Sequence, residues 1–443
     1  MIRYFLLIVF VALIGSRALG LDLGLGPGLS IKNAFLYATA LLIAIDGALT
    51  RNRQIELLPV ILPFALLITY AVASWIFIVV FLDYPNYSPL ATFIRLKTKL
   101  VDQFIVLLVF FYGVVNWRDA VWLLKSITWV VVVGCLVTVV DTFNIPDLGI
   151  VTARTFDGRV EGIMASAGEF SGLLAFFLPA MVALVWAETG FARKLAVVGV
   201  GLGFVSILIA ASRGAMVGLI ISSIASAIYL RRYISAQMVL RATLAVFMLI
   251  AVAVVVVMST DFGSILQERM STGLESGDAQ EISSGRTIIW LAALRELADY
   301  PLSFIIGLGW ESYFQAVGYR YATHNVYLDR IYNLGLIGLV LFVLTYANAI
   351  VIARRGLQHA PKQAIPFLMA TVVGMAAMMI TMTFADLENA VTLALAYAGL
   401  TLRIAIGTPL GTDSQLESQP IDERWNRDQR KPATRPMSVT PKR

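Results

Sequence analysis

The stretch "YATHNVYLDRIYNLGLIGLVLF", Tyr321 to Phe342, begins with polar residues and ends as a hydrophobic helix. An apolar run of this kind predicts a membrane-spanning helix, because about 20 apolar residues are needed to cross the hydrocarbon core. His324, one of only two histidines in the chain, directly precedes this run. The side of the membrane that this helix end faces therefore decides what His324 can do.

The composition is that of an integral membrane protein. Of the 443 residues, 59% are hydrophobic and only 14% are charged, and the mean hydropathy is +0.81. A soluble domain is nearer half apolar and a quarter charged. The net charge of +6 lies mostly in short loops and the tail, which indicates membrane topology and not a nucleic-acid-binding surface. One cysteine and two histidines exclude an intrachain disulfide and metal sites built from these residues.

Apolar runs near 20 residues long predict an all-α polytopic bundle of about twelve spans within residues 1–405. The first run also fits a signal peptide cleaved after Gly20, and both interpretations stay open. The polar, proline-bearing residues 406–443 are expected to form a disordered cytoplasmic tail. The expected spans lie near residues 2–18, 32–50, 57–81, 101–116, 119–141, 169–187, 195–211, 214–230, 240–258, 326–352, 365–384 and 387–405.

Basic residues in alternate loops set the orientation by the positive-inside rule, with both termini in the cytoplasm. The long loop 259–323 then lies on the outer side and contains a short amphipathic helix. One run disagrees, because "RLKTK", Arg95 to Lys99, falls on the outer side and is interpreted as a re-entrant or interfacial piece. The loops that agree contain Arg51 and Arg53, then Arg118, then Arg193 and Lys194, then Arg231, Arg232 and Arg241, and finally Arg354, Arg355 and Lys362.

Arg213 interrupts continuous hydrophobic sequence in "ILIAASRGAMVGLIISS". Placing an arginine at bilayer depth costs about 2.5–3.5 kcal/mol on insertion scales. The residue either snorkels to the headgroups or binds an anion. Ser212 can cap a helix that begins at Arg213, and a cation at a helix N-terminus is unfavourable unless an anion lies between them. Gly214 and Gly218 would let a neighbouring helix pack closely.

The long outer loop repeats this arrangement in "EISSGRTIIWLAALRELADYP". Ser284 is the expected cap of a helix that ends before Pro301, with Arg286 in its first turn. The apolar positions of this helix suit the outer membrane surface or the bundle: Ile288, Leu291, Ala292 and Leu294. Arg286 can equally be an ordinary solvated arginine.

His324 is the third candidate at an outer helix start. It lies, with Thr323 and Asn325, at the outward N-terminus of the expected helix 326–352. A helix N-terminus keeps imidazole neutral, and neutral histidine is a competent general base for an alcohol. The alternative is a capping or headgroup contact. Two arginines and a histidine at three helix starts on one face could bind a diphosphate without a metal.

These residues resemble the O-antigen ligase and polymerase superfamily of bacterial inner-membrane proteins. "HNVYLDRIYNLGLIGL" is similar to its motif of His-Asn, nine residues and Gly-x-x-Gly-Leu, and "SRGAMVG" and "SSGRTIIWLAAL" are similar to its arginine segments. The segment "GRVEGIMASAGEF" resembles the start of the conserved half, about residues 150–345, through Arg159 and Gly162. Glu169 and Val217 depart from the family pattern, which often has asparagine and leucine at these positions. The motif matches are His324, Asn325, Gly335, Gly338 and Leu339.

The resemblance implies a GT-C-like, inverting glycosyltransferase that needs no metal, cofactor or nucleotide sugar. Arg213 and Arg286 would bind the diphosphate of an undecaprenyl-linked oligosaccharide donor, and His324 would activate the acceptor hydroxyl. The acceptor would be a glycan or lipid A-core, and a flippase and a chain-length regulator are candidate partners. Weaker candidates for substrate contacts are Arg159, Arg320, Asn325, Tyr327 and Asp329.

Two functional alternatives remain. Within the family, the sequence fits a polymerase of lipid-linked repeat units, for exopolysaccharide or O-antigen, as well as a ligase, and we prefer the exopolysaccharide polymerase. From another class, a twelve-span transporter or lipid-linked glycan flippase would bind substrate without glycosyl transfer. Transporters place their polar site near the membrane midplane between repeated halves, whereas this chain has no visible repeat and its basic residues cluster at the outer face.

Overall fold

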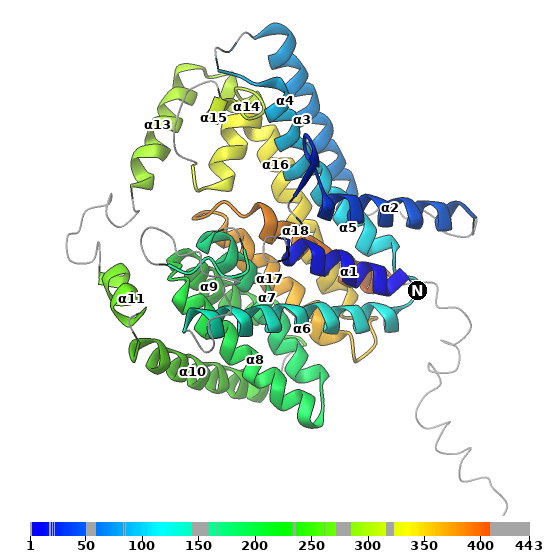
Figure 1. The fold of residues 1–443 in the computed structure, drawn as a ribbon, viewed down its shortest axis with the longest axis vertical. Helices are drawn as coiled ribbons and strands as arrows, with labels where there is room; N and C mark the ends of the chain where they lie inside the picture. The colour runs from blue at the N-terminus through cyan, green and yellow to red at the C-terminus, as the bar shows by residue number, and fades with distance from the viewer. Residues whose placement is uncertain are drawn as a thin grey trace, which may run out of the picture.

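The protein, described from a computed structural model, is almost entirely helical (Figure 1). Ile406, the first residue of the expected tail, is still helical, and the tail from residue 408 on lies outside the described residues, as do Ser284 and Arg320. The structure describes residues 2–16, 23–49, 59–82, 86–143, 159–164, 166–233, 236–260, 262–271, 285–315 and 323–407, together with residues 19, 21 and 84.

A helix overlaps each of the twelve expected ranges, and six described helices are long and apolar enough to cross a membrane. The all-α membrane class is therefore confirmed, while twelve spans stay a prediction. The six are α3 Ile61–Phe81, α6 Trp117–Thr142, α7 Ala167–Ala187, α8 Gly190–Ile209, α16 Val326–Gly356 and α18 Glu388–Ile406.

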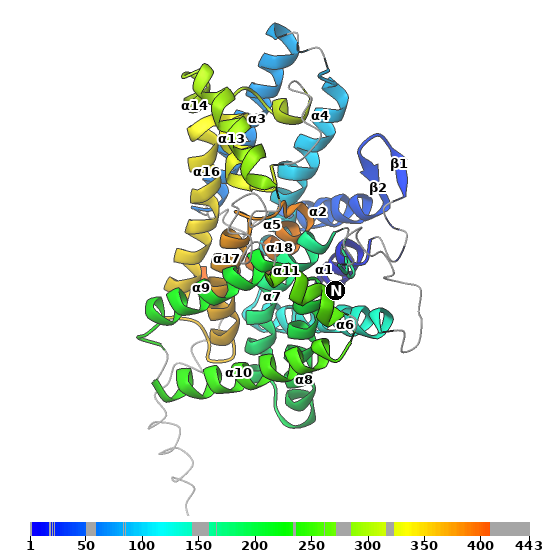
Figure 2. The same ribbon diagram turned by 90° about the vertical axis from the view of Figure 1, so that its left-hand side faces the viewer.

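The other described elements are a small hairpin and further helices. A small hairpin, β1 Gly24–Gly26 and β2 Leu29–Ser30, stands beside α2 (Figure 2). The loop 259–323 contains four described helices instead of the single one expected, because two of them have only four residues and leave no periodic pattern. The other helices are α1 Ile2–Ile14, α2 Ile31–Leu49, α4 Pro89–Leu96, α5 Asp102–Tyr112, α9 Arg213–Tyr229, α10 Ala236–Met258, α11 Phe262–Ser271, α13 Arg286–Asp299, α14 Ser303–Ile306, α15 Ser312–Gln315 and α17 Ile365–Thr381.

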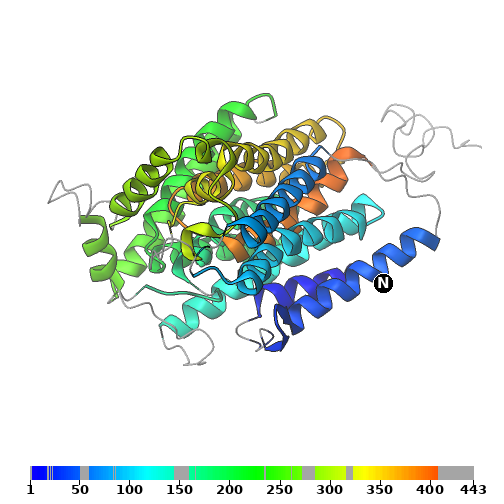
Figure 3. The same ribbon diagram turned by 90° about the horizontal axis from the view of Figure 1, so that it is seen from above.

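The core is built around α7 and α18, whose side chains are mostly buried. Phe176, Phe177 and Tyr397 pack edge to face at the centre, with ring centroids 5.1–5.6 Å apart. This geometry is favourable for aromatic rings and adds about 0.5–1.5 kcal/mol per pair to the burial of apolar area. Seen from above, the long helices run side by side around this core (Figure 3).

Several helix ends meet at one end of the bundle, which we call the His324 end. The Val326 backbone N–H donates to the Met382 carbonyl over 2.9 Å, which joins the start of α16 to the end of α17. The Glu169 carboxylate, at the start of α7, accepts the backbone N–H groups of Asn389 (3.1 Å) and Ala390 (2.8 Å) at the start of α18. One carboxylate therefore satisfies two helix N–H groups that would otherwise lack partners.

The basic loops gather at the opposite end of the bundle. The Arg354 guanidinium lies 4.3 Å from the Tyr229 ring centroid, which joins the end of α16 to the end of α9. Lys125 forms an ion pair with Glu188 at 3.2 Å, near the end of α7. Arg51, Arg53 and the side chain of Arg241 lie outside the described residues. The alternation of basic loops thus matches a separation of the two ends in the described part of the chain.

The "RLKTK" run is helical, and its interpretation as a re-entrant or interfacial piece stays a prediction. A π-helical turn, Lys97–Val101, joins α4 to α5 in one helix. The charges of the run are neutralised by acidic partners, since Lys97 pairs with Asp102 and Lys99 pairs with Glu311, each at 2.9 Å. These basic residues therefore lie at the His324 end without contradicting the other loops.

Helix α16 is broken at Gly335, which has φ 62° and ψ −168°, a conformation that essentially only glycine adopts. Residues 326–334, the first arm, fold back along residues 336–356, the second arm. The Tyr327 and Phe342 rings lie 6.1 Å apart, whereas fifteen residues of straight helix would separate them by about 22 Å. The expected single inward helix 326–352 is therefore wrong, because the first arm runs opposite to the second.

Candidate functional site

His324 lies in a small turn before the first arm, with a left-handed backbone at φ 48°. Hydrogen bonds hold the turn on both sides: the Thr323 hydroxyl donates to the Asn325 carbonyl (3.1 Å), and the Trp290 indole donates to the Thr323 carbonyl (2.8 Å). Asn325 is the N-cap, and its side-chain oxygen accepts two backbone N–H groups of the first arm. The expected position at a helix N-terminus is confirmed, but that N-terminus belongs to the first arm.

Charges from three other segments act on His324. Although the residue keeps an exposed surface, partial burial lowers the pKa of the His324 ring below its ordinary value. The positive charges of Arg286 and Arg159 lower this pKa further, while the carboxylate of Asp386 acts in the opposite direction. The net effect favours the neutral ring, which is the form that can accept a proton.

Arg213 is the first residue of α9 and lies at the same end. A Cβ added to Gly214 would lie 2.6 Å from the Phe384 Cβ, and one added to Gly218 would lie 2.6 Å from the Thr381 hydroxyl oxygen. The two glycines thus allow the close packing that the sequence predicts, next to the segment that holds Val326. Ser212 occupies the N-cap position, but its side chain makes no cap hydrogen bond, so the expected side-chain cap is wrong.

Arg286 is the first residue of α13, after Gly285 with φ 78°. The helix buries Ala293 and Leu297 against the Tyr313–Tyr332 ring pair. The apolar positions singled out in the sequence point elsewhere, because the side chains of Ile288, Leu291 and Leu294 are exposed. Contact of that face with the bundle is therefore wrong, and its contact with the membrane surface stays a prediction.

Arg159 is placed by the neighbouring backbone. The Val160 N–H donates to the Ile209 carbonyl over 3.4 Å, which attaches this segment to the end of α8. Gly162 has φ 60°, and a Cβ there would lie 2.6 Å from the Phe170 ring, so close packing at the start of α7 requires glycine. Arg159 is thereby held near enough to His324 for its charge to be felt.

The weaker candidates have structural contacts in the first arm. The Tyr327 hydroxyl donates to the Met379 carbonyl over 2.6 Å. Asp329 accepts from the Asn333 amide (2.8 Å) and the Arg330 guanidinium (3.2 Å). The expected contacts of Asn325, Tyr327 and Asp329 with a glycan stay predictions. Among the described residues, no three His, Cys, Asp or Glu side chains are grouped to hold a metal ion.

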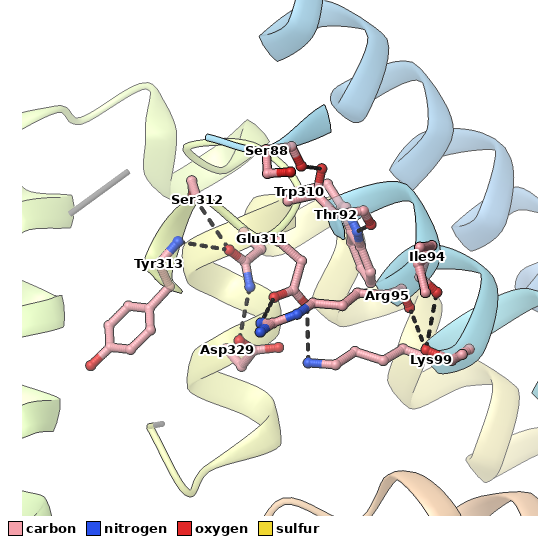
Figure 4. Close-up of polar contacts among 12 residues, drawn as sticks. Ser88, Thr92, Ile94, Arg95, Lys99, Trp310, Glu311, Ser312, Tyr313 and Asp329 are labelled. Carbon is pink, nitrogen blue, oxygen red and sulfur yellow. Dashed lines mark hydrogen bonds and ion pairs between the residues drawn. The ribbon is translucent and has the colours of Figure 1, made fainter. Parts of the chain in front are cut away.

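Sequence reasoning missed a buried charged cluster beside the first arm (Figure 4). The Glu311 carboxylate is 1% exposed and pairs with Arg95 and Lys99, each at 2.9 Å. Burial alone would raise the pKa of this carboxyl, but the two cations outweigh burial and lower it. Lys99 also pairs with Glu388 at the start of α18, at 2.9 Å. The sequence feature that could have revealed this cluster is the basic run from Arg95 to Lys99, which falls on the outer side.

Comparison with known proteins shows a similarity to one protein family over part of the chain. No curated protein matches the chain. The match to a family model begins at residue 198, so it excludes Arg159 and helices α1 to α7. Residues 198–343, which contain Arg213, Arg286 and His324, match the family model described as O-antigen ligase, so this part of the chain is similar to that family.

Proposed function

We propose that the chain is a glycosyltransferase that moves an undecaprenyl-diphosphate-linked glycan onto an acceptor hydroxyl at the periplasmic face of the bacterial inner membrane. The similarity to the O-antigen ligase family supports glycan transfer in a membrane. The observation that carries the proposal is the convergence at the His324 end: Arg286 and Arg159 act electrostatically on His324, and Arg213 begins the helix packed beside it.

Arg213, Arg286 and His324 each have a role in the proposed transfer reaction. The acceptor hydroxyl oxygen attacks the anomeric carbon, the bond from that carbon to the diphosphate oxygen breaks, and the configuration inverts. Arg213 and Arg286 stabilise the negative charge that develops on the leaving diphosphate, as guanidinium groups do for phosphate oxygens. His324 accepts the hydroxyl proton, and its neutral form near pH 7 suits this role.

Alanine substitutions test this assignment directly. Arg213→Ala, Arg286→Ala and His324→Ala should each abolish polymer formation in a complemented deletion strain while the protein still inserts into the membrane. Arg193→Ala, an exposed arginine at the start of α8 at the opposite end, is the matched control and should leave polymer unchanged. Near-normal polymer from any one of the three variants would refute the role of that residue.

Polymerase and ligase activity differ in the product that a deletion strain accumulates. A missing polymerase leaves single repeat units on the acceptor, whereas a missing ligase leaves long chains that are not attached to lipid A-core. We favour an exopolysaccharide or O-antigen polymerase, and gel analysis of lipopolysaccharide and secreted polymer distinguishes the two. A flippase and a chain-length regulator are the proposed partners in either case.

The transporter alternative predicts a different experiment. A transporter or flippase would move lipid-linked glycan across a liposome membrane without breaking the glycosyl–phosphate bond. Release of undecaprenyl diphosphate by the purified protein in liposomes, dependent on an acceptor, supports the transferase. Flipping without release would support the transporter.

A further inference from the structure

The first arm ends in a clamp that belongs to the long loop. Because Gly335 breaks the helix, the last carbonyls of the first arm need partners from elsewhere. Residues 306–313, the clamp segment, supply them: the N–H groups of Leu308 and Gly309 donate to the carbonyls of Tyr332 (2.8 Å) and Asn333 (3.0 Å). The Asn333 side chain also accepts from the Ser312 hydroxyl, at 3.3 Å. The clamp segment thus fixes the end of the first arm that lies opposite His324.

The clamp segment is itself held by the N-terminal third of the chain. We call residues 70–99, which comprise parts of α3, α4 and the π-helical turn, the socket. Three socket tyrosines donate to clamp carbonyls: Tyr70 to Ile306 (2.7 Å), Tyr84 to Leu308 (3.1 Å) and Tyr87 to Trp310 (2.7 Å). The Trp310 indole in turn donates to the Thr92 carbonyl over 3.1 Å. These socket residues lie outside the part of the chain that matches the O-antigen ligase family.

One buried ion pair lies at the centre of this contact (Figure 4). Glu311 on the clamp segment and Lys99 on the socket are buried, at 1% and 9% side-chain exposure, whereas their outer partners Arg95 and Glu388 are 38% and 36% exposed. Glu311 also adopts φ 59°, which is unfavourable for a residue with a side chain. Lys99 lies in a π-helical turn, a feature often found at functional sites.

Stability alone does not account for this pair. Replacing a buried ion pair by apolar residues of similar volume is often neutral or stabilising, because desolvation offsets the attraction between the charges. We propose that Lys99 and Glu311 are positioning residues: by joining the clamp segment to the socket, they hold the first arm, and with it His324, in the place that glycan transfer requires. This inference rests on the proposed function of His324.

A double substitution separates positioning from folding. Lys99→Met or Glu311→Met alone leaves a buried charge without its main partner, and should lower the Tm of the purified protein by about 5 °C and polymer yield at least about 10-fold. In Lys99→Met/Glu311→Met, the remaining Arg95 and Glu388 reach solvent. The Tm should therefore return to within about 2 °C of the natural protein, while polymer yield stays at least about 10-fold lower.

The measurement uses the full-length protein: polymer per unit of membrane-inserted protein in a complemented deletion strain, and Tm in detergent. Lys125→Met/Glu188→Met removes an ion pair at the opposite end and should leave polymer unchanged. Recovery of both Tm and polymer in the Lys99/Glu311 double variant would overturn the proposal. If the double variant stays unstable, Asn333→Ala replaces it, since this variant removes the hydrogen bonds from Ser312 and Tyr313 to the Asn333 side chain and leaves Asp329 its ion pair with Arg330. It should lower polymer about 10-fold, and normal polymer would overturn the proposal.

His324→Ala in the same strain keeps the two proposals apart. An inactive His324→Ala beside a fully active, folded double variant refutes the positioning role alone. An active His324→Ala refutes the proposed function, whatever the double variant does.

Discussion

His324 has an unusual backbone and an unusual charge environment at once. Its left-handed conformation is held by the bonded neighbours Thr323 and Asn325, and its ring is influenced by Arg286, Arg159 and Asp386. Two of these charges lower the pKa of the ring and one raises it. The protonation state of His324 therefore depends on residues that are far apart in the sequence.

The pKa of His324 can be measured directly, since the chain has only two histidines. In a protein with labelled histidine, we expect the His324 signal to titrate below the ordinary pKa of a histidine side chain, about 6.5. The lowered pKa keeps the ring neutral as pH falls below 7, so polymer formation should decline only when pH falls through that lowered value. NMR spectra of His359→Gln assign the signals, and a His324 midpoint at or above the ordinary histidine value would contradict the prediction.

Two neighbours should move this titration in opposite directions. Arg159→Gln removes a cation and should raise the pKa of His324, whereas Asp386→Asn removes an anion and should lower it further. The same NMR titration measures both shifts. A shift of the same sign in both variants would show that packing changes, and not charge, control the ring.

The sequence predicted the position of α16 but not its break at Gly335. The length of the apolar runs predicted a helix in every expected range, because spanning a membrane demands about 20 apolar residues. The same criterion merged the two arms, since the hydrophobic run continues through Gly335. What it lacked was the backbone conformation of one glycine, and that depends on the contact of the turn with Ile305 and Gly307.

Gly335→Ala should prevent the two arms from packing. A Cβ at this position would lie 2.2 Å from the Ile305 carbonyl oxygen and 2.5 Å from the Gly307 nitrogen, in a conformation that costs a further 1–3 kcal/mol or so. We expect little folded protein in size-exclusion chromatography and no polymer. Gly47→Ala, at a helical glycine with no atom within 4 Å of the added Cβ, should behave like the natural protein.

Glu169 joins two helices, although its identity departs from the family pattern. Glu169→Ala would leave the N–H groups of Asn389 and Ala390 without their acceptor, and should lower the free energy of unfolding by about 2 kcal/mol. Glu169→Gln keeps one acceptor oxygen and should lose less. Thermal unfolding of the purified variants measures both effects, and an unchanged Tm in Glu169→Ala would contradict this role.

The distribution of basic loops between the two ends of the bundle predicts that the His324 end faces the periplasm. Cys135 is the only cysteine and is buried, so Cys135→Ala provides a background for single-cysteine labelling. Leu25→Cys in the exposed β1–β2 hairpin should react with an impermeant maleimide in intact cells with a permeable outer membrane. Gln358→Cys, after α16, should react only after lysis. The reverse result would invert the proposed orientation.

The long-range contacts were the part of the molecule that the sequence could not reveal. Arg213, Arg286 and His324 were singled out because each interrupts a local pattern: a cation within or before a helix, or a lone imidazole beside an apolar run. Glu311 interrupts no local pattern, and its buried ion pair is formed with Lys99, which is far away in the sequence. Local sequence therefore predicted the residues proposed for chemistry and missed the contacts that hold them in place.

The buried cluster also has a consequence for how the protein is made. Arg95 leaves the ribosome 216 residues ahead of Glu311, which at about 5–20 residues per second is a delay of tens of seconds. During that interval Arg95 and Lys99 are left to water and phospholipid headgroups, because Glu311 has not been synthesised. We therefore expect membrane insertion of the early helices to precede assembly of the candidate site, which begins only when the chain beyond Glu311 has emerged.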